Sequence, residues 1–170
     1  FLASPWCCCV TSFLRVLHGL GGRRGGVQDR LASALARGGH GPRVTLLAVT
    51  KTHGPDAVQA AWQAGVQNVG ENKVQEALGK MTAVDVPVRW HLIGHLQRNK
   101  VRDLDHFAVV HSIDRDSIAD AVSAFGIARK RSVEALVQGN VAGEASTGGV
   151  EPAEMRAESE RVGMRAGLRS

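Results

Sequence analysis

Short apolar runs alternate with amphipathic stretches along most of the chain. The apolar runs have the nearly continuous hydrophobic character of strands that are covered on both faces. Five such runs lie at 43–50, 66–70, 88–94, 107–113 and 133–141. Between them, apolar residues recur every three or four positions, as they do in helices that bury one face. Helices are therefore predicted at 27–39, 56–65, 72–81, 98–104, 115–129 and 151–167.

This alternation is typical of βα units around a parallel sheet, and two α/β architectures fit it. A doubly wound sheet would be complete with five strands, whereas a (β/α)₈ barrel of the TIM type needs eight strands and typically about 250 residues. The chain has 170 residues, which is about one domain. Periodicity does not distinguish the two architectures, because both place helices between parallel strands.

The amino-terminal part of the chain breaks this pattern. The stretch GLGGRRGG at 19–26 reads as a flexible break, so we expect the folded domain to occupy 27–170 and 1–26 to be a separate, disordered segment. The sequence does not begin with methionine, and we expect the biological start to lie elsewhere.

The amino-acid composition limits the kinds of molecule that the chain is expected to bind. Apolar residues make up 44% and charged residues 22% of the chain, as in ordinary globular proteins. The net charge is +5, but the densest basic cluster is the three residues 129–131, which argues against nucleic-acid binding. No apolar run reaches the roughly 18 residues that a membrane span needs. Cys7, Cys8 and Cys9 are adjacent, a spacing that suits neither a disulfide framework nor a zinc knuckle, so we expect a reduced, cytoplasmic setting.

Polar side chains follow every predicted strand. In parallel α/β folds the carboxyl ends of the strands open onto one face, where sites are built. The polar residues at these ends are Lys51 and Thr52, Glu71 and Asn72, His95 and Gln97, Ser112 and Asp114, and Asn140 and Glu144. Asp114 has a simpler interpretation as a cap of the next helix, and we favour that one.

Lys51 has no such simple interpretation, because a lysine without a partner beside a buried strand is costly. Its amine could pair with a carboxylate such as Glu71, bind a phosphate, or form a Schiff base with an aldehyde. No GxxxxGK[ST] loop precedes it, which excludes a P-loop. Lys73, Lys80 and Lys100, by contrast, are predicted to be surface lysines.

Five motifs carry a resemblance to a known family. They are LLAVTKTHG, VGENKVQEALGKM, RWHLIGHLQRNK, VHSIDRDSIADAV and VQGNVAGEASTGGVEP, in this order. They resemble the pyridoxal phosphate homeostasis proteins, whose fold is a (β/α)₈ barrel like the N-terminal domain of alanine racemase. The resemblance implies that pyridoxal 5'-phosphate is the cofactor, that it is held as a Schiff base on Lys51, and that no catalytic turnover is established. The alternatives are a racemase-like enzyme, although the chain has no tyrosine to act as a second acid/base group, and an inactive fragment.

The same resemblance implies weaker roles at the other strand ends. Asn72, His91, His95 and Gln97 would line or support the cofactor pocket, and Asn140 would contribute from the fifth strand. His91 and His95 are four residues apart on one predicted strand, so both are expected to face the barrel interior. A zinc site is not predicted, because no third ligand is evident.

The resemblance also implies an incomplete barrel. Only about the first five strands are expected here, without the later loops that grip the cofactor phosphate in this family. The full-length protein is expected to be a monomer. The open strand edges of the shorter chain favour self-association. Gly139 stands where the family has an apolar residue, and we expect it to weaken the fifth strand.

Overall fold

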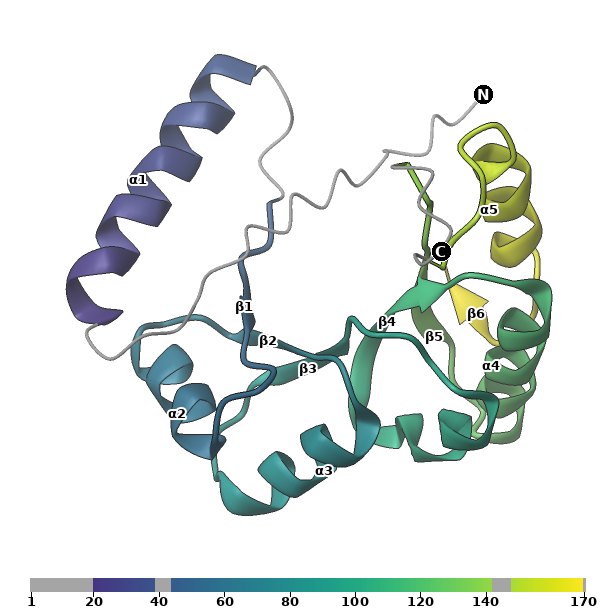
Figure 1. Cartoon of the computed structure of the whole chain (residues 1–170), viewed down its shortest axis with the longest axis horizontal. Helices are drawn as coiled ribbons and strands as arrows, with labels where there is room; N and C mark the ends of the chain where they lie inside the picture. Colours follow the sequence, from purple (N-terminus) through teal and green to yellow (C-terminus); the bar gives the residue numbers. More distant parts are fainter. Residues whose placement is uncertain (1–19, 39–43, 142–147, 170) are drawn as a thin grey trace.

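A computed structural model describes residues 20–38, 44–141 and 148–169 (Figure 1). These ranges hold six strands: β1 (Leu47–Val49), β2 (Asn68–Glu71), β3 (Arg89–Leu92), β4 (Phe107–Ile113), β5 (Val133–Val137) and β6 (Leu168–Arg169). The helices are α1 (Leu20–Gly38), α2 (Pro55–Gln63), α3 (Val74–Ala83), the 3₁₀ helix η1 (Arg98–His106), α4 (Asp116–Ala128) and α5 (Met155–Gly163).

The sheet is parallel throughout, and its strands lie side by side in the order of the sequence, from β1 to β6. A doubly wound sheet reverses its strand order at a switch point, and this sheet does not. Figure 1 shows the sheet as a curved wall with α2, α3, α4 and α5 along its outer side. The sequential order and the helices on one side identify the barrel-type α/β fold, and they exclude the doubly wound alternative.

The two faces of the sheet differ in chemistry. The outer face packs against the helices through a cluster of apolar side chains that includes Val69, Trp90, Leu92 and Val110. His91 lies between Trp90 and Leu92 in β3, and alternation along a strand turns its side chain to the inner face. The core of the domain therefore lies between sheet and helices, and the inner face accommodates polar groups.

Helix α2 shows how local sequence fixes an element. Pro55 occupies its first turn, where the missing N–H is not needed, and Asp56 follows at the positive end of the helix dipole. The helix ends at Gln63, two residues before the predicted end at Gly65. Gly65 lies just beyond the C-cap with a φ of 75°, a conformation that glycine adopts without strain.

Several boundaries differ from the predicted ones. Helix α1 begins at Leu20, inside the Gly-rich stretch that was expected to be a flexible break. Residues 1–19, with the three cysteines, lie outside the described residues. The chain also contributes the start of a sixth strand, where five were expected, and the predicted helix at 98–104 is the 3₁₀ helix η1.

Gly139 does not weaken a strand, because β5 ends at Val137. Gly139 instead forms an isolated parallel bridge with Val150. A Cβ at this position would lie 2.4 Å from Sδ of Met155, the first residue of α5. The absence of a side chain therefore allows α5 to approach the chain beyond β5.

Among the described residues, no helix is both long enough and apolar enough to span a lipid bilayer.

The packing of β6 against α4 can be tested at Gly126. A Cβ on Gly126 would lie 2.3 Å from the carbonyl oxygen of Gly167, the residue that precedes β6, so backbone would have to move. We expect Gly126→Ala to lower the free energy of unfolding by about 1–3 kcal/mol or more. Gly79→Ala in α3 is the control, because nothing lies within 4 Å of the added methyl group.

Removing a helical glycine should stabilise the control by about 0.5–1 kcal/mol. Chemical denaturation of both variants measures the difference. Equal stability of Gly126→Ala and the wild type would contradict the close contact between α4 and the start of β6.

Candidate functional site

The carboxyl ends of neighbouring strands meet at one edge of the sheet. The chain beyond β1 stays paired with β2 through a 3.1 Å hydrogen bond from Thr50 N to Gly70 O. Beyond β2 and β3, Asn72 and Gly94 touch so closely that a Cβ on Gly94 would lie 2.3 Å from Asn72 O. Ser112 of β4 donates a 2.7 Å hydrogen bond to Gly94 O. The carboxyl-terminal ends of the first four strands are therefore joined at this edge.

Lys51 occupies the turn directly after β1. The preceding Thr50 is fully buried, and Lys51 itself is half-buried. The following Thr52 has a φ of 66°, in the left-handed region that β-branched residues rarely adopt. Backbone of this kind persists only where the surrounding structure holds it, and it is common at functional sites.

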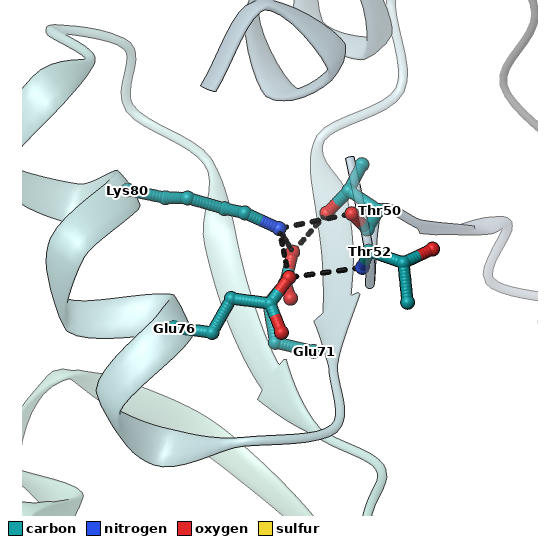
Figure 2. A network of polar contacts seen from close by, with 5 residues as sticks. All are labelled: Thr50, Thr52, Glu71, Glu76 and Lys80. Carbon is teal, nitrogen blue, oxygen red and sulfur yellow. Dashed lines mark hydrogen bonds and ion pairs between the residues drawn. The ribbon is translucent and has the colours of Figure 1, made fainter. Parts of the chain in front are cut away.

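Lys80 of α3 binds the backbone on the amino-terminal side of Lys51, at Thr50 (Figure 2). Its ammonium donates to Glu71 Oε1 at 2.7 Å, to Glu76 Oε1 at 2.8 Å and to the backbone oxygen of Thr50 at 2.9 Å. Thr50 Oγ1 also donates to Glu71 Oε1, at 2.5 Å. The three N–H groups of the ammonium thus each have an acceptor, as a buried charge requires.

Glu76 binds the backbone on the carboxyl-terminal side of Lys51, at Thr52. The backbone N–H of Thr52 donates to Glu76 Oε1 at 2.9 Å. One carboxylate oxygen of α3 therefore accepts from both Lys80 and Thr52, as Figure 2 shows. The residues on either side of Lys51 are both tied to this helix.

The two carboxylates in this network differ electrostatically. Burial raises the pKa of Glu71 above its usual value, opposed by the hydrogen bonds from Lys80 and Thr50. The hydrogen bond from Lys80 lowers the pKa of Glu76, which is only partly covered. Glu71 Oε2 is buried and has no hydrogen-bond partner among the described residues. The single ammonium therefore compensates two acids unequally.

Sequence reasoning missed this network. Lys80 was predicted to be a surface lysine, but it is 5% exposed, and Glu71, one suggested partner of Lys51, pairs with Lys80. A signal was present in the sequence. Val74, Ala77 and Lys80 recur every three residues on the buried face of α3, so the helical period itself places a lysine against the sheet.

His91 faces the inner side of the sheet and lies in a polar pair. Its Nδ1 is 2.9 Å from His111 Nε2 in β4, and its Nε2 is 3.0 Å from Asn68 Oδ1 in β2. Burial, followed by the nearby His111 and Arg89, lowers the pKa of His91 to about 4. Burial also lowers the pKa of His111, against the opposing effect of Glu134. Both rings are therefore neutral near pH 7.

His95 does not lie on β3 with His91, so strand alternation does not place the two side chains on one face. Strand β3 ends at Leu92, so the alternation of faces stops before His95, whose side chain is 55% exposed. Its Nδ1 lies 3.0 Å from Asp114 Oδ2, and Arg115 donates to the same carboxylate at 2.9 Å. Asp114 thus contacts both His95 and Arg115. It does not cap α4, at whose start no side-chain cap is present.

The remaining predicted residues also lie beyond strand ends. Asn72 is half-buried in the bend after β2, and Gln97 is exposed at the start of η1. Asn140 is 7% exposed, and its backbone N–H donates to Val150 O at 2.9 Å. Of these three residues, Asn72 has a backbone in close contact with Gly94 in the loop after β3. In the described parts of the chain, no three His, Cys, Asp or Glu side chains are grouped as metal ligands.

Comparison with known proteins identifies the family. The sequence pattern of the alanine racemase N-terminal domain family matches residues 26–169. The chain belongs to this family. Its parallel sheet with outer helices is the fold expected from the five motifs, and that expectation is confirmed.

Relatives within this family carry more specific names. A pyridoxal phosphate homeostasis protein of Pseudomonas aeruginosa is 42% identical over 146 residues, which are 84% of this chain and 64% of that protein. PipY of Synechococcus elongatus, solved without PLP, is 34% identical with a TM-score of 0.68 over 82% of this chain and 66% of PipY. PipY with PLP bound gives 32% and 0.65, over 84% and 66%. The chain thus spans less than two thirds of the length of these relatives.

The histidine pair predicts how stability depends on pH. An unfolded histidine binds a proton near pH 6.5, whereas the pKa of folded His91 is about 4. The unfolded state therefore binds more protons between these values, and stability falls as the pH falls. The contribution of His91 is complete above pH 6.5 and is lost toward pH 4, on the order of 3 kcal/mol.

Urea denaturation across this pH range, with His91→Gln and the exposed His106→Gln as variants, measures the effect. The groups that face the pair are Asn68, Arg89 and Glu134, and they are unchanged in both variants. His91→Gln should flatten the decline in stability, and His106→Gln should keep it. The same steep decline in both variants would contradict the assignment.

Proposed function

We propose that this chain carries the lysine end of a binding site for pyridoxal 5'-phosphate. The observation that carries the proposal is the position of Lys51 at the carboxyl end of β1, in a turn whose backbone is fixed on both sides. The names of the relatives support it, since they are pyridoxal phosphate homeostasis proteins and a PipY with PLP bound. We further propose that the whole protein acts in vitamin B6 and amino-acid homeostasis by holding the cofactor.

The residues present suit this cofactor at its aldehyde end. Thr50 donates its hydroxyl to Glu71 of β2, whose carboxylate also accepts from Lys80 of α3. Lys51 follows in the turn after β1, and in this proposal that turn presents its amine at the carboxyl-terminal edge of the sheet. The side chain of Lys51 is half-buried, and its primary amine can form a covalent bond with an aldehyde. When bound, pyridoxal 5'-phosphate supplies that aldehyde and an electron-accepting ring.

The other strand-end residues have supporting roles in this proposal. Asn72 and Asn140 offer amide groups at the same edge, and His95 and Gln97 lie at its solvent-exposed side. His91, bonded to His111 and Asn68, supports the inner face of the sheet rather than the edge. The cytoplasm is the proposed location, because adjacent Cys7 to Cys9 suit a reducing compartment.

The test is to identify which lysine takes the cofactor. Protein mixed with pyridoxal 5'-phosphate, reduced with borohydride and digested should carry the added mass on the peptide that contains Lys51. Lys51→Ala should lose the label, because Lys51 is the lysine in the turn directly after β1 whose backbone is held on both sides. Lys73→Ala is the matched control, since Lys73 is exposed beside the same sheet edge, and it should be labelled like the wild type.

A label distributed over Lys73, Lys100 and Lys130, with Lys51→Ala no different from the wild type, would contradict the proposal.

A further inference from the structure

The turn that contains Lys51 is held by a helix that contributes nothing else to the proposed site. On one side of Lys51, the oxygen of Thr50 accepts from Lys80; on the other, the N–H of Thr52 donates to Glu76. Both anchoring side chains come from α3, and they bind each other at 2.8 Å. The two anchors therefore move together with α3.

Thr52 explains why an anchor is needed. Its φ of 66° is unfavourable for a β-branched residue, so the turn would relax toward another conformation if nothing opposed it. The hydrogen bond to the Glu76 carboxylate opposes that relaxation, and a charged acceptor makes it stronger than a neutral one. A relaxed Thr52 would turn the preceding peptide and shift the attachment point of the Lys51 side chain.

The arrangement exceeds what packing of α3 alone would require. The apolar residues Val74 and Ala77 already bury α3 against the sheet. A buried ion pair contributes little stability over well-packed apolar side chains, so stability alone does not account for Lys80. Its ammonium is instead bonded to β2 through Glu71 and to the end of β1 through Thr50.

We propose that Glu76 and Lys80 are positioning residues for Lys51, which hold the backbone on its two sides so that its amine is presented at a fixed place on the inner edge of the sheet. This inference rests on the proposed function of Lys51 as the residue that holds the cofactor. A small displacement of a reacting group is sufficient to lose much of its reactivity.

The variants are chosen so that the buried ion pair remains. Glu76→Ala removes the acceptor of the Thr52 N–H and leaves Lys80 bonded to Glu71 and to Thr50 O. Glu76→Gln keeps a side-chain oxygen that accepts from both groups, so it is the rescue variant. Gln75→Ala is the matched control, an exposed neighbour on the same helix.

Three measurements are made, the first two without cofactor. The first is the hydrogen-exchange rate of the Thr52 backbone amide by NMR. The second is the rate at which an amine-reactive reagent, trinitrobenzenesulfonate, modifies Lys51, with Lys73 as the internal reference. A third is the dissociation constant of pyridoxal 5'-phosphate.

Glu76→Ala should speed exchange of the Thr52 amide about tenfold, as expected for the loss of one hydrogen bond to a charged group. It should change the modification rate of Lys51 relative to Lys73, and it should weaken cofactor binding by about the same factor. Glu76→Gln should restore most of each effect, and Gln75→Ala should show none.

Unchanged exchange at Thr52 and unchanged reactivity of Lys51 in Glu76→Ala would overturn the positioning role. A faster exchange at Thr52 with unchanged reactivity of Lys51 would also overturn it, because the contact would then be structural only. Failure of the proposed function looks different: the wild type itself would take no cofactor on Lys51, whatever the variants do to Thr52.

Discussion

The ammonium of Lys80 is the constraint on which the candidate site depends. It binds Glu71 of β2, Glu76 of α3 and the end of β1 at Thr50, within 2.9 Å of each. Glu71 is completely buried, and a carboxylate in that position requires a compensating charge. Because the three acceptors come from three elements, satisfying the charge fixes how β1, β2 and α3 meet, and with them the turn that contains Lys51.

The sheet separates this support from the chemistry that it serves. Helices cover the outer face, where apolar side chains and the Lys80 network fill the interface. The inner face carries polar groups, such as the His91–His111 pair. The loops after successive strands meet at one edge, as the contact between Asn72 and Gly94 shows. In barrel folds of this type, that edge is where binding sites are built.

Much of this fold can be predicted from the sequence, because its elements follow simple hydrophobic periods. The strands follow from such patterns, and the turn at Gly65 just beyond α2 follows from the conformational freedom of glycine. The order of the strands in the sheet cannot be predicted in this way, because barrels and doubly wound sheets show the same alternation of strands and helices along the sequence. The motif resemblance decided that question. Its choice of Lys51 as the cofactor lysine stays a prediction.

Side-chain partners were harder to predict, for physical reasons. The helical period places Lys80 on the buried face of α3, but it does not reveal the carboxylate of Glu71 that compensates its charge, and Lys80 was therefore predicted to be a surface lysine. His95 was misplaced because β3 ends before it, and Asp114 binds His95 and Arg115 where a helix cap was favoured. Each of these errors concerns either the exact end of a strand or a side-chain contact that hydrophobic periodicity does not specify.

The most direct test of this account is a crystal structure of the protein determined with pyridoxal 5'-phosphate. The account predicts continuous electron density between Lys51 Nζ and the aldehyde carbon of the cofactor on the inner side of the sheet. It also predicts that Lys80 still donates to Thr50 O and that Thr52 N–H still donates to Glu76. Density that joins the cofactor to another lysine, or a Lys51 side chain directed toward α3, would contradict it.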